Sequence, residues 1–113
     1  MVLSARSMTK KEFLTSSQLM ETVRKLDCKG QYKVCEAFFN MMLEEGFGDD
    51  SEMRLRFHDT FEDINPRHLE DSLMQLHFVV NDMDNAIYEI DIYEPGLFMG
   101  IARRLGEVIN ENK

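Results

Sequence analysis

The sequence lacks any long apolar run. Its most apolar stretches, such as residues 76–80, are a few residues long and are interrupted by a histidine, whereas a membrane-spanning helix needs roughly 20 apolar residues. The first residues become basic too soon to contain the apolar segment of a signal peptide. We therefore expect a cytoplasmic protein with no membrane segment, in which residues 1–8 form a flexible extension and residues 9–113 a single domain.

Cysteine is also scarce, and six residues separate the two that are present, Cys28 and Cys35. This spacing is not that of a Cys-x-x-Cys motif, and no second cysteine pair is present to complete a zinc site. We expect both to be free thiols in a reducing compartment. The chain has neither a Gly-x-Ser-x-Gly elbow nor a glycine-rich phosphate loop. No motif thus predicts a catalytic residue, a metal ion or a cofactor.

Basic side chains are outnumbered, 13 against 21 acidic ones, which gives a formal net charge of −8. The distribution is uneven, because residues 1–35 carry a net charge of +4, residues 36–95 carry −13 and residues 96–113 carry +1. The acidic middle repels phosphate and opposes the approach of nucleic acid to the basic first third. We therefore expect a protein partner with a basic surface rather than direct binding to nucleic acid.

Apolar residues make up 43% of the chain, which is enough for one core. Thr9 and Thr15 are each followed three residues later by Glu or Gln, the capping-box spacing that predicts the start of the first helix. A second helix is predicted over residues 31–45, with Gly46 ending it in the left-handed conformation. Asn65 followed by proline predicts the start of a third helix.

The remaining segments predict strands and a final helix. Residues 53–58 alternate between apolar and polar side chains, which is typical of a half-buried strand. Residues 77–80 and 86–93 read as a β-hairpin around the polar loop 81–85, and residues 97–110 as the last helix. The order α-α-β-α-β-β-α predicts an α+β domain of two layers, with about four helices on a small, mostly antiparallel three-stranded sheet.

The acidic middle is the most specific functional feature. Carboxylates on one face would steer a basic partner towards it, and an apolar side chain among them would anchor the interface. Our hypothesis is that the protein is a small, non-enzymatic regulator. It would occupy the basic site of a nucleic-acid-processing enzyme, an expectation that rests only on analogy of charge with inhibitors from phages and mobile elements. The predicted partner-binding residues are Glu44, Glu45, Phe47, Asp49, Asp50, Phe61, Glu62, Asp63, Asp82 and Asp84.

Two alternatives belong to other classes. His58, Asp59 and His68 are the side chains around which a small metal-dependent or acid–base enzyme would be built, although their spacing matches no helical zinc pair. The second alternative is a self-associating adaptor or assembly chaperone, a homodimer in which the basic first third meets the acidic middle of another copy.

Overall fold

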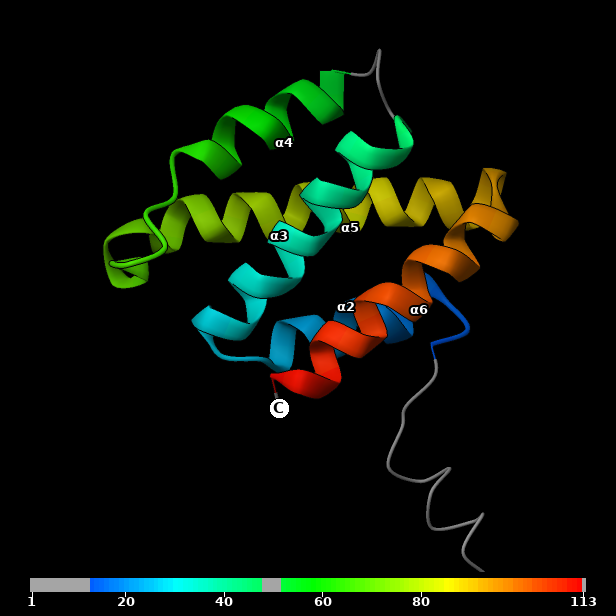
Figure 1. Cartoon of the computed structure of the whole chain (residues 1–113), viewed down its shortest axis with the longest axis horizontal. Coiled ribbons are helices and arrows are strands. Elements are labelled where there is room, and N and C mark those ends of the chain that lie inside the picture. Colours follow the sequence, from blue (N-terminus) through cyan, green and yellow to red (C-terminus); the bar gives the residue numbers. More distant parts are fainter. Residues whose placement is uncertain (1–12, 48–51, 113) are drawn as a thin grey trace, which may run out of the picture.

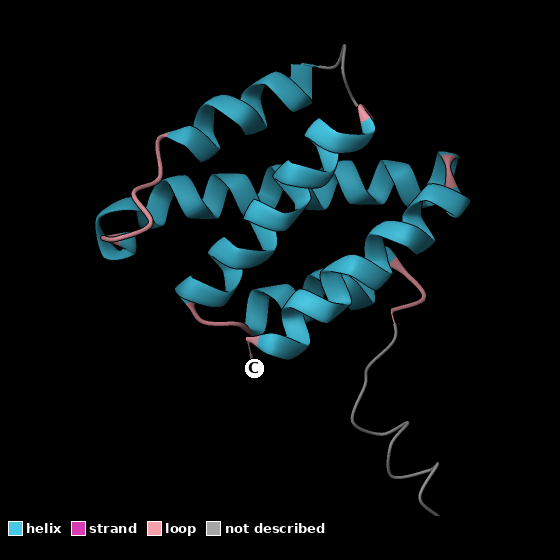
Figure 2. Ribbon diagram, in the orientation of Figure 1, coloured by secondary structure: helices cyan, strands magenta, loops and turns pink. Residues whose placement is uncertain are grey.

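The computed structural model describes residues 13–47 and 52–112, and these residues form helices connected by short loops. Figure 2 shows helices joined by loops, and no strand occurs within these two ranges. The prediction of an α+β domain with a three-stranded sheet is therefore wrong. The elements are α2 (Ser16–Lys25), α3 (Cys28–Glu45), α4 (Glu52–Glu62), the 3-10 helix η1 (Leu69–Ser72), α5 (Leu73–Tyr93) and α6 (Pro95–Glu111).

Side-chain caps define the first two helices. Thr15 is the N-cap of α2, and its hydroxyl oxygen accepts a hydrogen bond of 3.2 Å from the backbone N–H of Gln18. The Gln18 side chain in turn accepts from the N–H of Leu14 at 2.9 Å, so the predicted capping pair is confirmed at Thr15. Asp27 caps α3 by accepting from the N–H of Gly30 at 2.8 Å. This cap starts α3 at residue 28, one turn before the predicted start.

The end of α3 follows the sequence prediction closely. Gly46 has a φ of 71°, the left-handed conformation that glycine adopts without a steric cost, and its N–H donates to the carbonyl of Met42 at 2.9 Å. The chain then folds back so that the ring of Phe47 lies 5.7 Å from that of Phe38. The helix end is therefore closed by an apolar contact as well as by the glycine.

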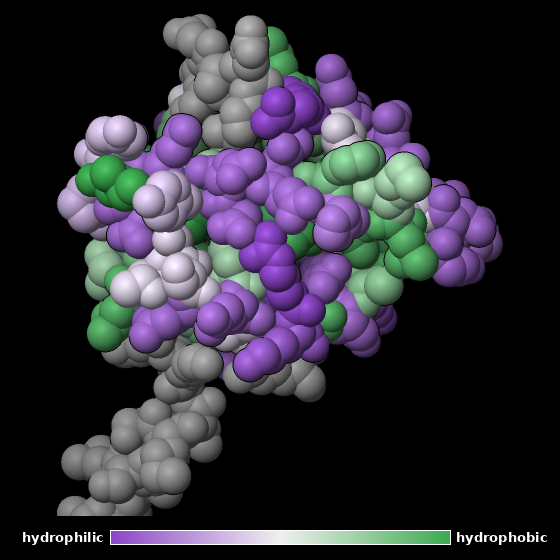
Figure 3. All heavy atoms as spheres, turned by 180° about the vertical axis from the view of Figure 1, so that it is seen from behind, coloured by the Kyte–Doolittle hydropathy of each residue, from purple (hydrophilic) through white to green (hydrophobic). Residues whose placement is uncertain are grey.

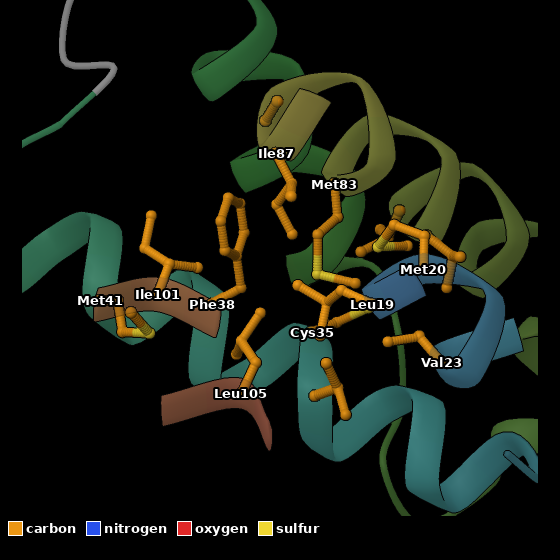
Figure 4. Packing of buried hydrophobic residues seen from close by; sticks show 14 of the residues in the cluster. Leu19, Met20, Val23, Cys35, Phe38, Met41, Met83, Ile87, Ile101 and Leu105 are labelled. Atoms are coloured by element: carbon orange, nitrogen blue, oxygen red, sulfur yellow. The ribbon is translucent and has the colours of Figure 1, made fainter. Parts of the chain in front are cut away.

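One apolar core connects the helices. Helix α5 runs across the molecule, α3 crosses it, and α2, α4 and α6 all contact α5 (Figure 1). In Figure 4 side chains from four helices point towards one another, among them Leu19 of α2, Phe38 of α3, Met83 of α5 and Leu105 of α6. All four are fully buried. No helix within the described ranges has the length and apolar character needed to cross a membrane.

Residues 53–58 belong to helix α4 rather than to the predicted strand. The alternating pattern placed Leu55 and Phe57 on one face, yet Phe57 is buried while Leu55 is exposed. The side chain that accompanies Phe57 is Phe61, four residues later, with the two rings stacked 6.0 Å apart. A separation of four residues is the helical period, which outweighs the short alternation of this segment.

The predicted hairpin is a single helix, α5, which spans 21 residues without interruption. Residues 81–85 look like a polar loop in the sequence, but Met83 is fully buried and Asp82 is held by Arg56 of α4. The buried apolar residues recur at three- and four-residue intervals, which is the period of a helix. They are Leu76, Val79, Val80, Met83, Ala86 and Ile87.

The predicted start of a helix at Asn65 is also wrong. The Asn65 side chain accepts a hydrogen bond of 3.0 Å from the N–H of Arg67, which stabilises a turn, and α5 begins only at Leu73 after the short η1. The final helix is confirmed with bounds two residues earlier and one residue later than predicted. Pro95 lies in its first turn, where the missing N–H has no cost.

Candidate functional site

Three of the predicted binding carboxylates are already paired within the protein. Glu44 contacts Arg104 of α6 at 3.3 Å, and Asp84 contacts Arg24 of α2 at 2.7 Å. Asp82 is paired with Arg56 as described below. Each pair joins two helices, so these carboxylates stabilise the arrangement of helices and contribute less negative potential to the surface than their number implies.

The pair between Asp82 and Arg56 has the most enclosed carboxylate of the three. Asp82 is 9% exposed, and both of its oxygens accept from Nε of Arg56, at 3.1 and 3.2 Å. Nη2 of the same guanidinium lies 3.1 Å from Oδ1. The planar fork of arginine suits this two-oxygen contact, and it holds α4 against α5.

Five exposed carboxylates gather at one end of the molecule, where α4 ends and α5 begins (Figure 1). We call this group the acidic corner. The exposed backbone turn at residues 65–68 lies within it, and Arg67 is the one Lys or Arg between residues 59 and 71. No carboxylate of the group forms a salt bridge with a lysine or an arginine in the ranges that the structure describes. The members are Asp59, Glu62, Asp63, Glu70 and Asp71.

Two histidines contact the acidic corner separately. Nδ1 of His58 lies 2.6 Å from Oε1 of Glu62 and 3.8 Å from Oδ1 of Asp59, and its ring packs 5.1 Å from that of Phe39. His68 lies 3.8 Å from Glu70. Each imidazole is positioned to become a local counter-charge when it is protonated.

One group of side chains in the described ranges has the arrangement of a cation site. Ligand atoms of His68, Glu70 and Asp71 all lie within 4.8 Å of one another, and all three residues are exposed. The predicted enzymatic set of His58, Asp59 and His68 does not form such a group. The structure therefore divides the histidines between two places and does not assemble them around one reacting atom.

The two predicted apolar anchors pack inside the protein. Phe61 stacks on Tyr32 at 5.4 Å and on Phe39 at 5.0 Å, and Phe47 contacts Phe38. Both are only partly exposed. Glu45 is exposed at the end of α3, while Asp49 and Asp50 lie outside the described residues.

The two cysteines differ in their surroundings, and both are free thiols as predicted. Cys28 is exposed in the first turn of α3, whereas Cys35 is buried in the core. Burial raises the pKa of the Cys35 thiol far above its usual value, because a thiolate would lose its hydration there. Burial also raises the pKa of Tyr32, with Glu36 adding to the effect. Cys35 is therefore a core residue and not a nucleophile.

Sequence reasoning missed a set of exposed apolar side chains on α5. Met74, Phe78, Tyr88 and Ile92 are 68%, 53%, 57% and 52% exposed. Their signal is present in the sequence as spacings of four, ten and four residues, but the prediction of a hairpin assigned them to separate elements. Once the segment is known to be one helix, they fall on one side of it.

Comparison of the chain with protein-family models, with curated proteins and with solved structures finds no match.

Proposed function

We propose that this protein is a small, non-enzymatic regulatory protein of the cytoplasm, which binds a basic protein partner through the acidic corner. The observation that supports this proposal is the contrast between two sets of carboxylates. Glu44, Asp82 and Asp84 are each neutralised by an arginine, whereas the five carboxylates of the acidic corner have no such partner in the described ranges.

Unpaired carboxylates that lie close together produce a negative potential, which accelerates the approach of a basic surface and selects for it. They also repel one another, and a partner that brings lysine or arginine side chains relieves this repulsion. This arrangement suits the recognition of a basic surface.

The test is affinity capture from the source cell with three forms of the full chain. The variant Asp63→Lys/Asp71→Lys reverses two charges of the acidic corner. The matched control, Glu107→Lys/Glu111→Lys, reverses two exposed charges of α6 and gives the same net charge. We expect the wild type and the control to retain the same basic protein, and the corner variant to lose it.

Binding should also weaken as salt concentration rises, because the ions screen exposed charges. Retention of the partner by the corner variant, or an affinity that is equal at low and high salt, would contradict the proposal. Duplex DNA added as a competitor identifies the kind of partner surface. If it displaces the protein, the acidic corner occupies a nucleic-acid site; if it does not, the corner binds another basic surface.

A further inference from the structure

Helix α5 is apolar on two opposite sides, and the residues that the structure describes cover only one of them. The covered side contributes Met83 and its neighbours to the core. The outward side carries Met74, Phe78, Tyr88 and Ile92, each more than half exposed. Figure 3 views the molecule from behind, the side on which α5 is not covered by α3, and it shows green apolar patches towards both sides of this face with a purple polar region between them.

The residues of this outward side are arranged symmetrically about position 83. Met74 and Ile92 lie nine residues before and after it, and Phe78 and Tyr88 lie five residues before and after it. Asn81 and Asn85 complete the series at a distance of two residues. Successive members are four, three, four, three and four residues apart, which is the spacing of a seam between two paired helices.

Such a series is complementary to itself when two helices run in opposite directions. An antiparallel pair centred on residue 83 sets Met74 against Ile92 of the second copy and Phe78 against Tyr88. Asn81 then meets Asn85 at the middle, where paired amides hydrogen-bond each other and fix the register. A two-fold interface requires this kind of self-complementarity, and a surface that met an unrelated partner would not need it.

Charges on one flank of the seam agree with the same pairing. Asp84 lies next to the two-fold axis, where it would meet Asp84 of the second copy. Arg24 of α2 contacts Asp84 at 2.7 Å and donates to the Asn81 side chain at 3.0 Å. In the dimer, the Arg24–Asp84 pairs of the two copies would lie side by side with alternating charges, which offsets the repulsion between the two carboxylates. Further along this flank, His77 would lie opposite Asp91 of the second copy.

The other flank is compensated in the same manner. Asp82 would approach its own copy near the axis, and Arg56 of α4 neutralises each of the two carboxylates with contacts of 3.1 and 3.2 Å. Beyond it, Gln75 would lie opposite Glu89 of the second copy, where the amide can donate to the carboxylate. The arginines of α2 and α4 thus offset the repulsion that the copies of Asp84 and of Asp82 would otherwise have near the axis.

We propose that the occupant of the outward side of α5 is a second copy of this chain, bound antiparallel and centred on residue 83 in a symmetric dimer. The proposal rests on the apolar and polar symmetry of α5 and on the paired charges at its flanks, and it is independent of the acidic corner.

The oligomeric state of the full chain gives the first test. Sedimentation velocity should show a concentration-dependent dimer for the wild type. Phe78→Asp introduces a charge on the seam and should weaken self-association about 30-fold or more, as expected for an aromatic anchor buried in an interface. The control Leu43→Asp makes the same kind of change at an exposed leucine of α3 and should leave the dimer intact. Circular dichroism confirms that both variants stay helical.

A wild-type chain that remains monomeric at a concentration of hundreds of micromolar would overturn the proposal, and the face would then belong to another occupant. An equal loss of dimer in both variants would overturn it as well, because the association would not depend on α5.

Cross-linking tests the direction and register. In a Cys28→Ser background, which removes the exposed native thiol, Asn81→Cys and Asn85→Cys are prepared separately and then mixed. The antiparallel pairing predicts a disulfide-linked dimer in the mixture and little in either protein alone. Efficient cross-linking of Asn85→Cys with itself would indicate a parallel pair and refute the stated geometry.

Discussion

Removal of the Arg56 guanidinium should destabilise the protein more than removal of the carboxylate charge that it contacts. The Asp82 side chain is 12% exposed, while that of Arg56 is 59% exposed. Arg56→Ala leaves a poorly hydrated carboxylate without its partner. We expect a loss of about 2 kcal/mol, below the roughly 3–5 kcal/mol typical of a fully buried pair, because one side of this pair is open to water. Asp82→Asn returns a guanidinium to solvent and should cost about 1 kcal/mol.

Urea unfolding followed by circular dichroism, at one fixed protein concentration, measures both changes. The double variant Arg56→Ala/Asp82→Asn should be more stable than Arg56→Ala alone, because the unpaired charge is gone. Arg104→Ala is the matched control. It breaks the pair with Glu44, in which both side chains are well exposed, and such pairs contribute less than about 1 kcal/mol.

Equal losses for Arg56→Ala and Asp82→Asn would refute this reasoning. So would a double variant no more stable than Arg56→Ala, since either result would mean that water replaces the arginine without cost. A difference of about 1 kcal/mol corresponds to a Tm difference of about 4 °C for a domain of this size, which thermal unfolding resolves.

Three further outcomes follow from the packing. Phe57→Ala should lose about 4 kcal/mol in the same urea assay, because the ring is fully buried against three other phenylalanines, whereas Leu55→Ala, at an exposed position of the same helix, should change stability by less than about 0.5 kcal/mol. Gly46→Ala should cost about 1 kcal/mol because of its φ of 71°; an unchanged midpoint would exclude this helix end as a source of stability. A thiol reagent should label Cys28 in the native protein and Cys35 only after unfolding, since burial raises the pKa of Cys35 and keeps reagent away; rapid labelling of two thiols at neutral pH would contradict the packing.

Helix ends were the part of this fold that the sequence predicted well. Thr15 and Gly46 act through bonds to backbone groups a few residues away, so local sequence contains all the information that determines them. The outcome was different where a residue's state depends on a distant partner. Asp82 lies in a segment that resembles a polar loop, and its partner Arg56, which holds it in the middle of a helix, is 26 residues away.

In the candidate site, too, features set by local sequence could be predicted, whereas features set by distant partners could not. The acidic character of residues 59–71 could be read directly from the sequence. Which carboxylates lack an arginine partner could not, because it depends on where Arg24 and Arg104 meet them, 60 residues along the chain from Asp84 and Glu44 respectively. The count of charges therefore predicted that the surface is acidic, and the packing of the helices determines which carboxylates belong to the acidic corner.

The wrong prediction of a hairpin for residues 77–93 and the exposed apolar side of α5 have the same physical cause. A helix with a single apolar side shows a clear period of 3.6 residues, and apolar residues on two opposite sides obscure that period. In α5, Tyr88, Ile90 and Ile92 alternate like a strand because Ile90 faces the core while the other two face outward. A helix that is apolar on both sides is expected to be covered on both, and the described ranges of this chain cover only one. The residues that made the sequence look like a hairpin are therefore those that a second α5 would bury. An antiparallel pair would also place the two acidic corners at opposite ends of the dimer. Each corner would then be available to its own basic partner, or both to two sites on one partner.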